Sequence, residues 1–165
     1  MTLIEFKDKL KRQIERLSDD ERRQFALDIC KRLFPDYEAF YRKHKWGNLN
    51  NLKKGIKLCE QIKLDSNVNI DQLEELRKSI EEGTPDTENY GDWDGSYALN
   101  AAAAIIETLA FVQDKNIAHV LNVSELMTDT VDFKISQNFG NLSPEALDAH
   151  TWMIDERNRQ IDLTK

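Results

Sequence analysis

The sequence predicts an all-α protein, a single-domain helical bundle of about seven to eight helices over residues 1–165. Three observations lead to this prediction. Apolar residues make up 40% and charged residues 32% of the chain, which suits helices with one buried stripe and one charged face. Six Gly and three Pro are too few for the many turns of a β fold. A chain of 165 residues can bury a core without disulfides or metals.

Capping and stop signals divide the first half of the chain into five expected helices. Thr2 is a candidate N-cap, and Ser18 with Glu21 forms a capping box at the start of the second helical pattern. Pro35 suits the first turn of a new helix, and Gly83 with a proline two residues later is a common helix ending. Apolar residues recur at helical spacing between these signals. The expected helices cover residues 2–17, 18–34, 36–45, 48–64 and 70–83.

The second half is expected to contain one long loop, residues 84–95, and then three helices. Residues 97–113 include a run of alanines, whose small side chains let neighbouring helices approach closely, so we expect this helix at the centre of the bundle. Asn116 caps the next helix, which ends at Phe139, and Ser143 caps the last one. The inward face of the last helix is expected to carry Leu147, His150, Met153, Ile154 and Ile161.

The sequence predicts a cytoplasmic protein without a membrane segment. Charges interrupt the N-terminal residues, so they do not form the apolar region of a signal peptide. The longest uncharged run, residues 95–106, is too short to span a bilayer. Cys30 and Cys59 lie among apolar neighbours and are expected to be small core residues in a reduced compartment.

Charge is distributed unevenly along the chain. Residues 1–64 carry sixteen Lys and Arg against ten Asp and Glu, whereas residues 65–165 carry seven against twenty. Such asymmetry points to a partner, because summed charges steer association. The densest acidic segment, residues 81–94, has six acids, no base and two aromatic residues. Its candidate partner-binding residues are Glu81, Glu82, Asp86, Glu88, Tyr90, Asp92, Trp93 and Asp94.

Acidic side chains around Tyr and Trp suit a basic protein partner, since the rings offer contact area and the carboxylates offer steering. The alternative is a solvated loop whose Tyr90 and Trp93 fold back onto the bundle. Basic clusters at residues 7–12, 42–46 and 53–57 raise the question of nucleic-acid binding. Acids are interleaved with them and the pI is about 5.0, so direct binding of DNA or RNA is not expected.

Known catalytic and metal-binding patterns are not found in the sequence. His44, His119 and His150 do not stand at metal-ligand spacing with another ligand residue, and there is no phosphate-binding or nucleophile motif. His150 is interpreted as a half-buried structural residue. Glu107 stands out in the alanine-rich helix and would be a candidate for a shifted pKa if buried. The sequence therefore predicts no enzyme, cofactor or metal site, although an enzyme without a readable motif stays possible.

Four stretches of the chain resemble the YjaG-like family of bacterial helical proteins of unassigned function. The resemblance runs from about residue 10 to the end and implies a compact all-α bundle, with no catalytic residues to carry over. The stretches are residues 16–37, Trp46-Gly47-Asn48 with the following helix, Tyr90-Gly91 leading into residues 98–109, and residues 119–131.

The leading functional hypothesis is a stoichiometric inhibitor, an immunity protein that occludes the active site of a cognate basic nuclease toxin. It rests on the acidic second half, on the missing catalytic pattern and on an analogy with small acidic proteins of this kind. The alternative is a housekeeping interaction or scaffold domain, for example a homodimer joined through an apolar helix face. The sequence leaves open whether Trp46, Trp93 and Trp152 are core or contact residues.

Overall fold

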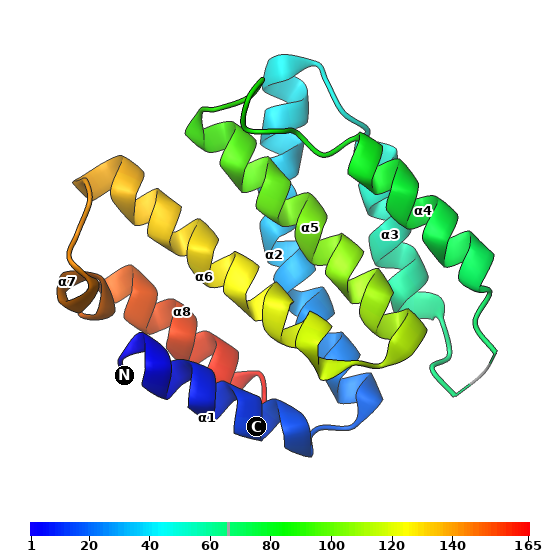
Figure 1. The fold of residues 1–165 in the computed structure, drawn as a ribbon, viewed down its shortest axis with the longest axis horizontal. Coiled ribbons are helices and arrows are strands. Elements are labelled where there is room, and N and C mark those ends of the chain that lie inside the picture. The colour runs from blue at the N-terminus through cyan, green and yellow to red at the C-terminus, as the bar shows by residue number, and fades with distance from the viewer. Residues whose placement is uncertain (66) are drawn as a thin grey trace.

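The computed structural model describes residues 1–65 and 67–165, which form eight helices and no strand (Figure 1). The predicted all-α bundle is confirmed. The helices are α1 (Leu3–Arg16), α2 (Asp19–His44), α3 (Leu49–Gln61), α4 (Ile70–Glu82), α5 (Trp93–Asp114), α6 (Ile117–Phe139), α7 (Pro144–Asp148) and α8 (Thr151–Asp162).

Helix α5 lies at the centre of the bundle, as its alanines predicted. It contacts α2, α3, α4 and α6 (Figure 1), and its buried small residues include Ala98, Ala101, Ala102 and Ala104. Close approach of four helices requires such small side chains. Among the described residues, α5 is also the one helix long and apolar enough to cross a membrane, with a mean hydropathy of 1.3. Because 72% of that stretch is buried inside the bundle, it has the pattern of a core helix in a soluble protein.

Helices α1 and α8 form an outer layer against α6, and both chain termini lie on that side (Figure 1). Phe6, Leu10 and Ile14 of α1 are buried. Thr164 donates a hydrogen bond to Gln13 at 2.5 Å, and Arg157 donates one to the carbonyl of Met1 at 2.9 Å. These contacts attach the two ends of the chain to each other.

The predicted caps and core cysteines are confirmed. Thr2 and Ser18 both form complete capping boxes, in which the N3 glutamate bonds back to the cap backbone. Asn116 and Ser143 cap α6 and α7. The two cysteines are buried free thiols.

The expected break at Pro35 is wrong, because α2 continues through it from Asp19 to His44. Proline removes one backbone hydrogen bond and normally destabilises a helix interior by about 3 kcal/mol. Pro35 is exposed, as is Lys31 four residues earlier, so the unbonded carbonyl faces water. On the opposite face Leu33, Tyr37 and Phe40 are buried, and this burial offsets the cost.

The last predicted helix is instead two helices, α7 and α8, separated at Ala149 and His150. His150 is the N-cap of α8, its Nδ1 accepting a hydrogen bond from the Trp152 amide at 3.2 Å. Because α8 begins anew at Thr151, the face of this helix that is buried differs from the predicted one. Met153 and Ile161 are buried as predicted, but Ile154 is 38% exposed.

Helix α5 also begins earlier than predicted, at Trp93. The long loop therefore ends at Asp92, its N-cap.

Candidate functional site

The acidic segment crosses one end of the bundle, where α2 ends and α5 begins (Figure 1). The buried Tyr37 anchors this end. Its hydroxyl donates to the carbonyl of Gly83 at 2.6 Å and accepts from the Asn48 amide at 3.0 Å. Gly47, with φ +101°, passes against the same hydroxyl, and a Cβ there would lie 2.4 Å from it. One side chain thus joins α2, the turn after it and the end of α4.

Tyr90 folds back onto the bundle and is half-buried. For this residue the structure agrees with the alternative prediction, a loop whose aromatic side chain packs on the bundle. Its ring lies edge-on to Phe40 at 5.0 Å and to His44 at 5.2 Å, and tilted against Trp46 at 5.3 Å. Such aromatic pairs contribute about 1 kcal/mol each beyond their burial. Tyr90 therefore fixes the segment to the end of α2 and offers little surface to a partner.

Asp92 and Asp94 are engaged within the molecule. Asp92 is the N-cap of α5, accepting a hydrogen bond from the Gly95 amide at 3.0 Å. The ammonium group of Lys43 forms an ion pair with Asp94 and lies 3.7 Å from Asp92. The hydrogen bond to Asp94 is the main reason that the pKa of Lys43 is raised. A basic residue from the first half of the chain thus neutralises part of the acidic segment.

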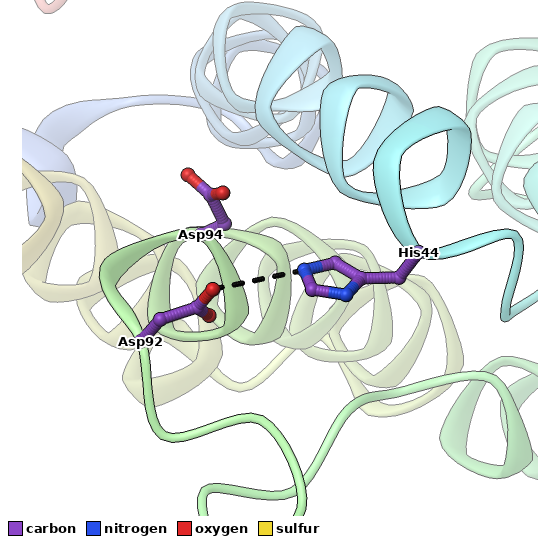
Figure 2. A group of neighbouring side chains, drawn as sticks. All are labelled: His44, Asp92 and Asp94. Atoms are coloured by element: carbon purple, nitrogen blue, oxygen red, sulfur yellow. Dashed lines mark ion pairs between the residues drawn. The ribbon is translucent and has the colours of Figure 1, made fainter.

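His44 completes a compact group with these two carboxylates (Figure 2). Its Nε2 lies 3.7 Å from Asp92, and the imidazole points toward that carboxylate. One donor atom of each residue lies within 4.8 Å of the others. The His44 ring is held between Phe40, at 4.6 Å, and Tyr90. Its Nε2 is shielded from solvent and makes no hydrogen bond among the described residues.

The other four acids of the segment remain exposed. Glu81 and Glu82 form the last turn of α4, and Asp86 and Glu88 follow in the connection to α5. In the part of the chain that the structure describes, none of the four makes an ion pair. Asp86 accepts hydrogen bonds from the backbone and side chain of Asn89, at 2.7 and 3.0 Å.

The three tryptophans differ in their surroundings. Trp46 is partly buried against the core. Trp93 is 38% exposed and stacks on Tyr97, with ring centroids 6.5 Å apart. Trp152 is 43% exposed and lies edge-on to Phe139 at 5.2 Å. Trp93 and Trp152 are therefore available for contact, at different places on the surface.

Glu107, which stood out in the sequence, is half-buried and bonded to His119. The Nδ1 of His119 lies 2.7 Å from Glu107, and its Nε2 lies 2.9 Å from Asp114. Burial lowers the pKa of His119, but the hydrogen bonds to the two carboxylates outweigh it and raise the pKa above 6.5. This cluster joins α5 to α6 through the imidazole of His119.

We expect this cluster to make stability depend on pH. A histidine whose pKa is raised on folding stabilises the native state fully below its unfolded pKa, and that contribution disappears as pH rises through the folded pKa. Denaturant unfolding at about pH 6 and about pH 9 measures it. The difference in stability between wild type and His119→Gln should be larger at the lower pH. A difference that is equal at both values would contradict this assignment.

Sequence reasoning missed the group of His44, Asp92 and Asp94. The two aspartates stand at alternate positions, which is ordinary for a helix start, and His44 is 48 residues before Asp92. Nothing in the spacing links them, because the link is the packing of the segment across the end of α2. The only hint was the aromatic richness around His44 and Tyr90.

Comparisons with known proteins give a family and a fold. A family model described as "Protein of unknown function (DUF416)" matches residues 9–165. The crystal structure of a DUF416 family protein from Shewanella baltica OS155 is similar, with a TM-score of 0.81 and 25% identity over 93% of this chain and 80% of that chain. No curated protein matches this chain. The expected resemblance to a helical family of unassigned function is confirmed at this level.

Proposed function

We propose that this chain, which belongs to the DUF416 family of proteins of unknown function, acts by binding a basic protein partner and not by catalysis. Within that family, the four stretches quoted above favour the YjaG-like group. The observation that carries the proposal is the set of exposed carboxylates, at the end of α4 and in the connection to α5, that form no ion pair with any described residue. Those carboxylates belong to Glu81, Glu82, Asp86 and Glu88.

Carboxylates that no cationic side chain neutralises keep their field available to an approaching cation. Asp92 and Asp94 contribute less, because Lys43 already pairs with both of them. Exposed Trp93, at the start of α5, supplies an aromatic contact near the same end of the bundle. Aromatic anchors beside charged groups are typical of the residues that dominate binding energy.

In its specific form, the proposal is that the chain is an immunity protein. It would occlude the active site of a basic nuclease toxin, its carboxylates pairing with the Lys and Arg that normally hold phosphates. The experiment is to express the product of the adjacent gene with and without this chain in a host cell. Growth rescue that requires this chain supports the immunity role. A neighbouring product that is not toxic, or toxicity that the chain does not relieve, contradicts it.

Neutralising the four exposed acids should slow association. We expect the quadruple variant Glu81→Gln, Glu82→Gln, Asp86→Asn, Glu88→Gln to bind the partner about tenfold more slowly at low salt. The difference should shrink at high salt, because ions screen exposed charges. Stopped-flow or surface-based kinetics measures both effects.

A matched control removes the same number of charges elsewhere. Asp8, Glu15, Glu145 and Asp155 are exposed carboxylates of α1, α7 and α8, with no ion pair to any described residue. Changing them to amides should affect the association rate much less. Equal slowing by both quadruple variants would mean that net charge, and not this surface, controls binding.

A homodimeric scaffold is the second candidate, and the exposed apolar residues near α8 favour it. Phe139 is 56%, Leu142 37% and Trp152 43% exposed, a cluster of the kind that marks interaction surfaces. Sedimentation velocity of the purified chain tests it. A dimer that Trp152→Ser dissociates and Trp93→Ser does not would favour the scaffold role, whereas a monomer would exclude it.

A further inference from the structure

We propose that His44, Asp92 and Asp94 bind a divalent transition-metal ion of the zinc class, and that Lys43 is a built-in cation that the metal displaces. Imidazole nitrogen and carboxylate oxygen are both zinc ligands, and three protein ligands leave a fourth position for water. The proposal concerns metal binding by the isolated chain and does not depend on the proposed function.

The first argument is distance. Zinc binds nitrogen and oxygen ligands at about 2.0–2.2 Å, so two ligands of one ion lie roughly 3–4 Å apart. The 3.7 Å between His44 Nε2 and Asp92 Oδ2 falls in that range. The largest separation in the group is within 4.8 Å. Binding of all three donors to one ion requires the Asp94 side chain to leave Lys43 and turn toward the other two.

The second argument is the state of the histidine. An imidazole nitrogen that is shielded from water is normally hydrogen-bonded, because an unsatisfied polar atom costs about 1–3 kcal/mol. His44 Nε2 is shielded and has no such partner among the described residues. It points toward the Asp92 carboxylate (Figure 2). A metal ion would satisfy this nitrogen in its unprotonated form, through the lone pair that an acceptor nitrogen carries.

The third argument is that two of the ligands are held in place before any ion arrives. Phe40 and Tyr90 fix the plane of the His44 ring. The cap on Gly95 uses Asp92 Oδ1 and leaves Oδ2 facing His44. Ligands that are already oriented lose less conformational entropy on binding.

The charges around the group favour a cation overall. Two carboxylates contribute negative charge, and His44 is the last residue of α2, where the helix dipole attracts cations. The positive N-terminus of α5 opposes this, as does Lys43. The ammonium of Lys43 is on a flexible side chain that is 58% exposed, so it can swing into water at little cost. Lys43 therefore weakens metal binding without blocking it.

Nitrogen ligation determines which ions should bind. An imidazole favours Zn²⁺ and Co²⁺, whereas Mg²⁺ prefers all-oxygen sites. We expect one Zn²⁺ per chain in competition with a chromophoric chelator, a Co²⁺ complex with visible absorption bands, and no displacement by millimolar Mg²⁺. Displacement of Zn²⁺ by Mg²⁺ would overturn the ligand assignment.

Substitutions locate the ion. His44→Gln and Asp94→Asn should each weaken Zn²⁺ affinity by about tenfold or more, and Lys43→Gln should strengthen it several-fold. The gain with Lys43→Gln is decisive even if a ligand variant folds poorly, because an exposed lysine is not needed for folding. Unchanged affinity in all three variants, or no Zn²⁺ binding by wild type, would overturn the proposal.

His119→Gln is the matched control. His119 also lies between two carboxylates, but both of its ring nitrogens are already hydrogen-bonded to them. It offers no free lone pair to a metal, so its replacement should leave Zn²⁺ affinity unchanged. Loss of Zn²⁺ binding in this variant would place the ion at α5 and α6 and overturn the assignment to His44.

Discussion

Glu156→Ala is expected to lower the free energy of unfolding by about 3 kcal/mol, because it removes the buried partner of a partly buried arginine and leaves that arginine only the longer pair with Asp28, at 3.9 Å. Glu156 of α8 is 5% exposed and forms an ion pair with Arg32 of α2. Its other oxygen accepts a hydrogen bond from Gln160 at 2.9 Å, and Gln160 accepts one from Ser124 of α6 at 2.5 Å. The loss therefore affects the junction of three helices.

Urea unfolding of wild type and variant measures this effect. Asp155→Ala is the control, since Asp155 is the exposed neighbour and has no ion pair with the described residues. Surface substitutions of that kind change stability by about 0.5 kcal/mol or less. Equal stability of the two variants would show that the Arg32–Glu156 pair does not hold α8 in place.

Gly95→Ala is expected to destabilise the protein by about 2 kcal/mol, although alanine is the better helix former. An added Cβ at Gly95 would lie 2.2 Å from the carbonyl oxygen of Tyr90 and 2.9 Å from its Cβ. Overpacking of this severity costs about 1–3 kcal/mol, and the contact is with backbone that cannot rotate away. The gain in helix propensity, roughly 1 kcal/mol, does not compensate.

The clash should act on the acidic segment first, because Tyr90 is its attachment to the bundle. Hydrogen exchange of residues 84–92 should become faster in Gly95→Ala than in wild type. Gly140→Ala is the control, because a glycine can be required either for lack of space or for a positive φ. Gly140 has φ +81° and no atom within 4 Å of an added Cβ. Alanine at this position would therefore introduce backbone strain without a steric clash, and it should leave the exchange of residues 84–92 unchanged. Unaltered exchange in both variants would contradict the packing of Tyr90 against Gly95.

Local signals in the sequence predicted most of the helix starts. Thr2, Ser18 and Asn116 cap the helices expected of them, and Ser143 is an N-cap as predicted, although its helix α7 is short. A capping interaction involves residues within one turn and is visible in the sequence. The prediction at Pro35 was wrong because it depends on contacts between helices, which the local sequence does not show. Whether a helix tolerates proline depends on which side faces water, and this is decided by the packing of α2 against α5 and α6.

The functional surface was harder to predict. All six acids of residues 81–94 are close in sequence, but only the fold shows that Lys43 pairs with two of them. The same fold brings His44 to Asp92 across 48 positions. Contacts between distant segments do not produce a repeating pattern in the sequence. Neither the pairing of Lys43 with the aspartates nor the candidate metal site could therefore be predicted from residue spacing.

The same limit explains the error at α8. A break at Ala149 and His150 resets the helical phase, and it places Glu156, Arg157 and Gln160 on the buried face. Polar residues on a buried face make no hydrophobic pattern, and their partners come from α1, α2, α6 and α7. The sequence pattern consequently assigned Ile154 to the core in error.

The most direct test of the central claim is the mass of the complex formed with the product of the adjacent gene. The tagged chain and that product are co-expressed, purified at low salt and analysed by size-exclusion chromatography with light scattering. We predict co-elution as a one-to-one complex that the Glu81, Glu82, Asp86 and Glu88 quadruple variant weakens. Separate elution of the two proteins, with this chain running alone, would contradict the account.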